Sequence, residues 1–349
     1  MSRVAAFTFP RSVLGWASMA LALAVAAAFV SRGGVARLEA TYMAFVMLAG
    51  FSMGGLALLM IGHLMNEHWL APVRSEAEAA ALMMPLLLVI GIPLAFGLDQ
   101  LFPWARGEPD LPPARAAFLD PRFYLARSVA YIVLGTLVAC WLVSTRHPRR
   151  VSGIGLAVLT PVMTFAAFDW VLSRSPQWWS SLFGFAFSLS QVLAALAAAI
   201  LITLLKPEHA APKRMLSLER ALLTALLLAL WTWFAQFLIV WLANLPAEVS
   251  WYLDRSDPRS LGLIAVAVVA TLAAVALLVP SGVSRTSMVI GSALALLQHA
   301  AHMLFIFRPV SWSWLDLGLA CGMAVAWGCL FTLVTRMRPT YEDEMSEDP

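Results

Sequence analysis

Two polar segments follow long apolar runs, and they hold the residues best suited to acid–base chemistry. The first, residues 169–184, begins with Asp169, and the second, residues 236–255, carries Glu248. A carboxylate next to hydrocarbon is costly, so it is normally paired, lines a wet cavity or handles protons. We therefore expect ion pairing or proton transfer at these two segments.

The composition indicates the environment of these segments. Of the 349 residues 61% are apolar and 12% are charged, whereas soluble domains have roughly 25% charged residues. The chain is therefore expected to be an integral membrane protein. Its net charge of +3 is scattered between apolar runs, which gives no support to nucleic-acid binding. Cys140, Cys321 and Cys329 lack the spacing of redox or zinc motifs, so we interpret them as packing residues.

Apolar runs of about 20 residues, the length that crosses a bilayer, recur along the chain. They predict an all-α, polytopic fold with about ten transmembrane helices. The first run follows two arginines and lacks a clean cleavage site, so we interpret it as a retained helix. The expected spans are 13–30, 41–65, 81–98, 123–144, 151–172, 182–205, 220–243, 261–279, 286–307 and 313–335.

A faint internal repeat relates residues 41–172 to residues 182–307, and each copy opens with a similar short segment. The repeat would give two four-helix bundles, with the first and last spans at the periphery. A chance match between apolar segments explains the similarity nearly as well. Small residues such as Gly54 and Gly55 would let neighbouring helices approach closely.

The distribution of Lys and Arg over the connections indicates the orientation. These residues are slightly more frequent near the two termini and in the even-numbered connections, and the cluster at 146–150 is the sharpest element. Both termini are therefore predicted to be cytoplasmic, with residues 336–349 as an acidic cytoplasmic tail. An amphipathic stretch with Glu76 and Glu78 is expected on the same side.

This topology brings a set of polar residues to the outer ends of the spans. The aromatic residues there fit an interfacial belt as well as a binding site. The charged residues fit either an outward ring of salt bridges, with Asp169 paired to Arg127 or Arg174, or a functional cluster, and the sequence leaves both interpretations open. The polar set includes Arg127, Asp169, Gln236, Asn244, Glu248 and His302.

Haem and metal binding have little support. His299 and His302 are three residues apart in one predicted helix, so they share a face and cannot bind opposite sides of one haem. The spans also lack the spacing of a metal site, a phosphate-binding loop or a nucleophilic triad. We expect the chain to bind no cofactor of its own.

The two polar segments and one earlier loop resemble a known family. The resemblance spans roughly residues 40–255. Three segments depart from the family pattern, one within this range (216–220) and two after it (283–285 and 302–305). The matching residues are Leu101-Phe102-Pro103-Trp104; Asp169-Trp170, Ser173, Pro176, Trp178, Ser180-Ser181 and Phe183-Gly184; and Phe234 to Trp241, Asn244-Leu245-Pro246, Glu248, Trp251-Tyr252 and Arg255. Together they look like the F subunit of alternative complex III, a bacterial quinol:cytochrome c oxidoreductase, which is related to the NrfD-like membrane anchors of polysulfide reductase.

The resemblance implies a subunit without redox centres in the inner (cytoplasmic) membrane of a bacterium. Its implied partners are a multihaem cytochrome, an iron–sulfur protein and a sister quinone-binding membrane subunit. Quinone would bind either next to this chain or only to the sister subunit, and the sequence leaves both possibilities open. Proton transfer is then expected from Asp169, Glu248 and His302. The expected quinone vicinity comprises Trp178, Gln236, Asn244, Trp251 and Arg127.

Two other functions fit part of the pattern. A secondary transporter would bind its substrate near the bilayer midplane, where ionisable residues other than His299 are nearly absent from the predicted spans. A purely structural membrane anchor would dock partner subunits through the outer tryptophan-rich loops and would need no titrating residue.

Overall fold

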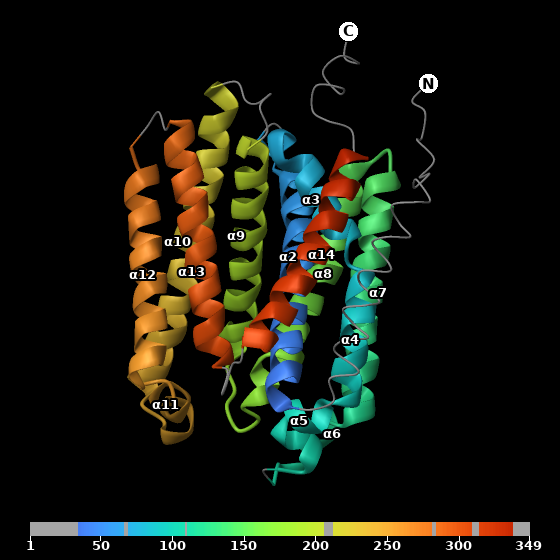
Figure 1. The fold of residues 1–349 in the computed structure, drawn as a ribbon, viewed down its shortest axis with the longest axis vertical. Helices are drawn as coiled ribbons and strands as arrows, with labels where there is room; N and C mark the ends of the chain where they lie inside the picture. The colour runs from blue at the N-terminus through green and yellow to red at the C-terminus, as the bar shows by residue number, and fades with distance from the viewer. Residues whose placement is uncertain are drawn as a thin grey trace.

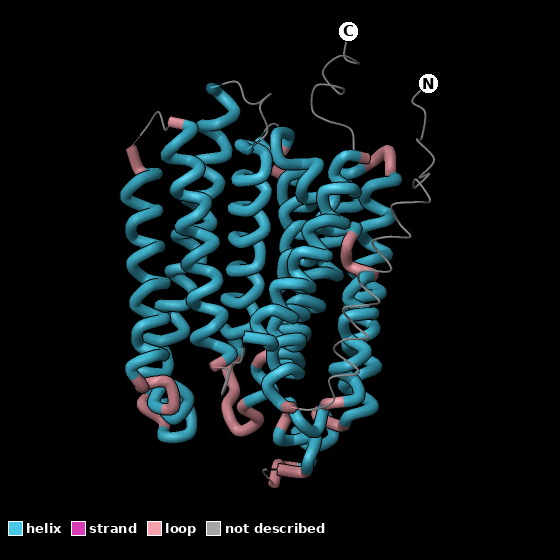
Figure 2. Tube along the Cα trace, viewed as in Figure 1, coloured by secondary structure: helices cyan, strands magenta, loops and turns pink. Residues whose placement is uncertain are grey.

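The structure is a computed structural model that describes residues 34–65, 69–108, 110–205, 212–280, 284–308 and 314–337. Within these ranges all regular structure is helical and the helices are joined by short loops (Figure 2), which confirms the expected all-α class. The predicted first span at 13–30 and most of the acidic tail lie outside the described residues.

The helices follow the predicted spans closely. Their limits are α2 Val35–Leu64, η2 Ala71–Val73, α3 Arg74–Leu82, α4 Leu86–Phe96, α5 Leu98–Leu101, η3 Pro103–Arg106, α6 Pro113–Phe118, α7 Pro121–Ser144, α8 Pro148–Trp170, η4 Leu172–Arg174, α9 Ser181–Leu205, α10 Pro212–Ala243, α11 Pro246–Leu253, α12 Pro258–Leu278, α13 Arg285–Phe307 and α14 Trp314–Arg336. Proline occupies the first helical position of α7, α8, α11 and α12, where its missing N–H is not needed.

Seven of the described helices are long and apolar enough to cross a membrane, and a bent pair of helices brings the number to eight. This pair, Ala71–Leu82 and Leu86–Phe96, replaces the single span expected at 81–98 and is bent by 41°. Pro85 lies at the bend and cannot donate a backbone hydrogen bond, so the chain starts a second helix there. Glu76 and Glu78, which were expected on an amphipathic surface, are buried in α3.

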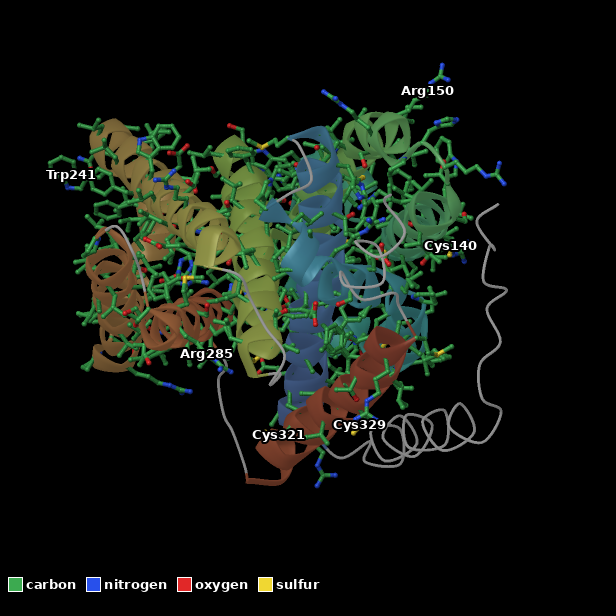
Figure 3. The ribbon with its side chains drawn as sticks, turned by 90° about the horizontal axis from the view of Figure 1, so that it is seen from above. Cys140, Arg150, Trp241, Arg285, Cys321 and Cys329 are labelled. Carbon is green, nitrogen blue, oxygen red and sulfur yellow. The ribbon has the colours of Figure 1, made fainter. Side chains whose placement is uncertain are left out.

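The helices run side by side with α2 and α9 at the centre (Figure 1). Helix α2 contacts α3, α4, α8, α9 and α14, and α9 contacts α8, α10 and α13 as well. Seen from above, α7 and α8 lie on one side of this pair and α10, α12 and α13 on the other (Figure 3). The short elements α5, α6 and α11 lie together at one end of the bundle, which we call the α11 end (Figure 1).

Large apolar side chains cover the outside of the bundle. Leu137 of α7, Trp231 of α10 and Val269 of α12 are 60%, 63% and 65% exposed, and Trp241 points away from the bundle at its edge (Figure 3). A soluble monomer rarely exposes such continuous apolar surface, whereas hydrocarbon solvates it. The chain is therefore a multi-pass membrane protein. The three cysteines are exposed rather than packed inside, contrary to our interpretation.

Close contact between α2 and its neighbours depends on small residues, as predicted. A Cβ atom at Gly54 would overlap the backbone carbonyl of Gln191 in α9. A Cβ atom at Gly55 would lie 2.8 Å from the Cβ atom of Ala80 in α3. Backbone approach of this kind is typical of helix pairs in membranes, where packing rather than water drives association.

We predict that Gly54→Ala lowers the free energy of unfolding by about 1–3 kcal/mol, because overpacking against a fixed backbone forces α2 and α9 apart. Gly322→Ala is the matched control, since a Cβ atom at Gly322 of α14 meets nothing within 4 Å. Thermal unfolding of both purified variants in detergent measures the difference. Equal midpoints for the two variants would contradict the proposed role of Gly54.

Candidate functional site

The two polar segments meet at the α11 end. The Trp178 indole Nε1 donates a hydrogen bond to the backbone carbonyl of Glu248 at 3.0 Å. The rings of Trp178 and Trp251 stack with centroids 4.8 Å apart. These contacts confirm the prediction that the segments 169–184 and 236–255 lie on the same end of the protein.

Asp169 lies in the last turn of α8 and is completely buried. Arg127 of α7 binds it through two hydrogen bonds, from Nη2 to Oδ1 at 2.6 Å and from Nε to Oδ2 at 2.8 Å. The Tyr131 hydroxyl donates to the same Oδ2 at 2.7 Å. Arg127 and Tyr131 are four residues apart and therefore share one face of α7. This two-pronged geometry is the strongest form of arginine–carboxylate pairing.

Aromatic rings shield this ion pair from water. The Arg127 guanidinium carbon lies 4.0 Å from the ring centroid of Phe118 and 4.2 Å from that of Phe123. The Arg127 Nη1 atom is buried and has no hydrogen-bond partner. The pair between Asp169 and Arg127 that the sequence suggested is therefore present, but it points inward rather than forming an outward ring.

Arg174, the other suggested partner of Asp169, binds a different acid. Its Nη2 atom donates to Glu39 of α2 at 2.7 Å, and its guanidinium carbon lies 5.3 Å from the ring centroid of Tyr42. Sequence reasoning missed Glu39, because nothing in the first turns of α2 indicates which of its faces turns inward. The two ion pairs together join α2, α7, α8 and η4.

An apolar cavity of about 190 Å³ lies next to these pairs, between α2, α4, α7 and α8. Tyr42, Tyr124, Ser128 and Trp170 are the lining residues whose side chains carry a polar atom. The Trp170 Nε1 donates to the Ser128 hydroxyl at 3.0 Å, and the Trp170 carbonyl accepts from the Tyr42 hydroxyl at 2.5 Å. Trp170 directly follows Asp169, so the cavity and the buried carboxylate belong to one structural unit.

A second group of predicted residues lies in the other half of the bundle. The Ser180 hydroxyl donates to Gln236 Oε1 at 2.5 Å, and the Gln236 Nε2 atom is buried without a partner. His302 is buried, with its ring edge-on to Trp233 at a centroid distance of 4.4 Å. Phe305 contacts both His302 and Trp251, which connects His302 to the stacked tryptophans.

Two predicted residues have other local roles. Asn244 is exposed and has a positive φ of 48°, a left-handed conformation that asparagine tolerates, directly after the last residue of α10. It therefore turns the chain between α10 and α11 and does not join the cluster, contrary to expectation. Glu248 lies in the first turn of α11, where a carboxylate stabilises the helix dipole, and it contacts Trp178 through its backbone.

A group of buried polar residues lies inside the bundle, and of its members sequence reasoning had named only His299 and His302. Several of their atoms have no hydrogen-bond partner, including Ser52 Oγ, Gln191 Oε1, Ser292 Oγ, Gln298 Oε1 and the Nδ1 atoms of His299 and His302. The signal was present in α13, where polar residues recur at helical spacing on the face that contacts α9 and α12. Such atoms are usually satisfied by internal water.

The described residues contain no group of three side chains that could hold a metal ion. The chain matches no protein-family model, and no curated protein sequence matches it at a significant level. Because these comparisons identify no relative, the function has to be inferred from the geometry of the site. That geometry combines a shielded carboxylate, a ring-sized apolar cavity and buried polar atoms that need water.

We predict that Asp169→Leu or Arg127→Leu alone lowers the free energy of unfolding by about 3–5 kcal/mol, because each leaves an unpaired buried charge. The double variant should lose much less than the sum. Tyr131→Phe removes one hydrogen bond and should cost about 1 kcal/mol. Unfolding midpoints of the four variants in detergent measure the coupling, and additive losses would show that the pair contributes no coupling energy.

Proposed function

We propose that the chain is a cofactor-free membrane subunit of a bacterial quinol-oxidising complex of the alternative complex III type, with both termini cytoplasmic. The observation that carries this proposal is the buried Asp169 network beside the apolar cavity. An apolar cavity of about 150 Å³ is large enough to bind benzene, so about 190 Å³ suits one substituted six-membered ring. The resemblance of residues 40–255 to the F subunit supports the same assignment.

Access from the bilayer supports a lipid-soluble ligand. Leu88 and Ile92 of α4 and Val129 of α7 line the cavity, and they are also 38%, 43% and 49% exposed on the outside of the bundle. A quinol that diffuses in the membrane would enter between these helices without crossing water. Its hydroxyl groups would meet the hydroxyls of Tyr42, Tyr124 and Ser128.

The chemistry assigned to the chain is proton transfer. Oxidation of a quinol releases two protons and two electrons, and the electrons would pass to redox centres of partner subunits. Asp169, oriented by Arg127 and Tyr131, would accept a proton beside Trp170, which lines the cavity. Glu248 and His302 would pass protons on, and Trp178, Trp251 and Gln236 would shape the surroundings of this route.

The buried polar atoms of α9 and α13 fit a water-filled proton route. The Gln191 amide nitrogen lies 3.8 Å from Met303 Sδ, and its Oε1 has no partner. Ser292, His299 and His302 share the buried face of α13, with His299 about two helical turns after Ser292 and His302 about one turn after His299. Water molecules between such groups can relay protons through apolar surroundings. We also propose that the helices form the two four-helix bundles of the internal repeat, with α14 at the periphery.

We predict that Glu248→Gln and Asp169→Asn each lower quinol-dependent turnover of the purified complex about 100-fold or more, because a positioned proton carrier usually contributes about 10²–10⁴-fold. Glu108→Gln is the control, because Glu108 is an exposed acid at the same end. Turnover must be normalised to assembled complex, since Asp169→Asn leaves Arg127 without its counter-charge. Reduced assembly with normal turnover would instead indicate a structural anchor, and normal values for both variants would reject the assignment.

We predict that Ala95→Phe, which places a ring inside the apolar cavity, raises the KM for quinol or abolishes turnover. Ala265→Phe is the matched control, because Ala265 is exposed on α12 and does not line the cavity. Steady-state kinetics with a short-chain quinol gives the KM and kcat of the two variants for comparison. An unchanged KM and kcat for Ala95→Phe would place the quinol elsewhere.

A further inference from the structure

A second cavity, of about 160 Å³, lies at the α11 end and has a polar wall. Both halves of the bundle contribute to it. Arg174 comes from η4, Asp254 and Arg255 come from the turn after α11, and Arg308 follows α13. Three guanidinium groups and one carboxylate therefore line a space that the proposed proton chemistry does not use.

Arg255 is the centre of this wall. It is only 9% exposed, and its guanidinium carbon lies 3.6 Å from the ring centroid of Trp251. Its nitrogens donate to the backbone carbonyls of Trp251 at 2.9 Å, Phe305 at 3.3 Å and Ile306 at 3.0 Å. It forms no ion pair with a carboxylate in the described part of the chain. Burial, and next the charge of Arg308, lower the pKa of Arg255 to about 10, so it remains cationic at neutral pH.

The other two arginines leave donors for a ligand. The Nη1 atom of Arg174 is buried and has no hydrogen-bond partner. The Nε atom of Arg308 lies 3.7 Å from Asp257, and about half of the Arg308 side chain is exposed. Asp254 is exposed, so water screens its charge from the cavity.

We infer that this polar cavity binds a phosphate-type anion. Guanidinium groups present planar, paired donors that match phosphate oxygens, and a buried arginine without a carboxylate partner gains most from such a ligand. The phosphate could belong to a phospholipid headgroup at the membrane surface or to free inorganic phosphate. The inference does not depend on the proposed quinol chemistry.

A purely structural role explains part of this arrangement. Arg255 bonds the last carbonyl groups of α13, as a cation at a helix C-terminus does. That role requires neither Arg174 nor Arg308, and it does not require a polar cavity between them. An anion would connect η4, the turn after α11 and the end of α13, which come from different halves of the chain.

The test uses the delipidated full-length protein in neutral detergent. Phosphatidylglycerol, phosphatidylethanolamine or inorganic phosphate is titrated while the thermal unfolding midpoint is recorded, and native mass spectrometry counts the retained lipids. The wild type should give a saturable rise with phosphatidylglycerol or inorganic phosphate. Arg308→Gln should weaken the apparent affinity roughly ten-fold, the usual effect of losing one charge-assisted hydrogen bond to phosphate.

Arg259→Gln is the matched control, because Arg259 is exposed at the same end and does not line the cavity. Arg255→Gln should abolish the rise, and Arg308→Gln keeps the test decisive if Arg255→Gln does not fold. A rise with phosphatidylglycerol alone identifies a lipid headgroup, and an equal rise with inorganic phosphate identifies a free anion. No saturable rise in the wild type, or equal losses in Arg308→Gln and Arg259→Gln, would overturn the inference.

Discussion

The high cost of an unpaired charge in apolar surroundings determines the structure of the α11 end. Asp169 is completely buried, so it must be neutralised by Arg127 within the same layer of side chains. Glu39 is equally constrained and is paired with Arg174. Because the partners come from different helices, each pair fixes the rotation of two elements about their axes. The apolar cavity lies between α4 and the three helices α2, α7 and α8. The ion pairs hold these three helices but do not involve α4.

Backbone packing and contacts of tryptophan side chains, rather than charge pairing, join the two halves of the chain. Backbone contact at Gly54 brings α9 against α2, and the Trp178 indole bonds the carbonyl of Glu248 across the halves. Trp178 stacks on Trp251, and both indoles are buried.

The sequence predicted the spans well, because a run of apolar residues long enough to cross a bilayer leaves little choice of structure. It also offered Arg127 and Arg174 as alternative partners of Asp169, since all three lie at span ends on one side, and the structure pairs Asp169 with Arg127. It failed where helix rotation decides the outcome, because nothing in α2 indicates that Glu39 meets Arg174. In α13 the spacing of the polar residues indicates a shared face but not which of their atoms lack hydrogen-bond partners. The bend at Pro85 and the turn at Asn244 are backbone effects that an apolar run does not reveal.

The contact between Tyr42 and Arg174 links the linings of the two cavities. The Tyr42 ring lines the apolar cavity, and the guanidinium of Arg174, which lines the polar cavity, lies 5.3 Å from the centroid of that ring. An anion bound in the polar cavity would share Arg174 with Glu39 and weaken that ion pair, because the guanidinium has a fixed set of donors. Tyr42, whose hydroxyl bonds the Trp170 carbonyl, would then sense the occupancy of the polar cavity. An anion bound at the α11 end would in this way affect the apolar cavity through Arg174 and Tyr42.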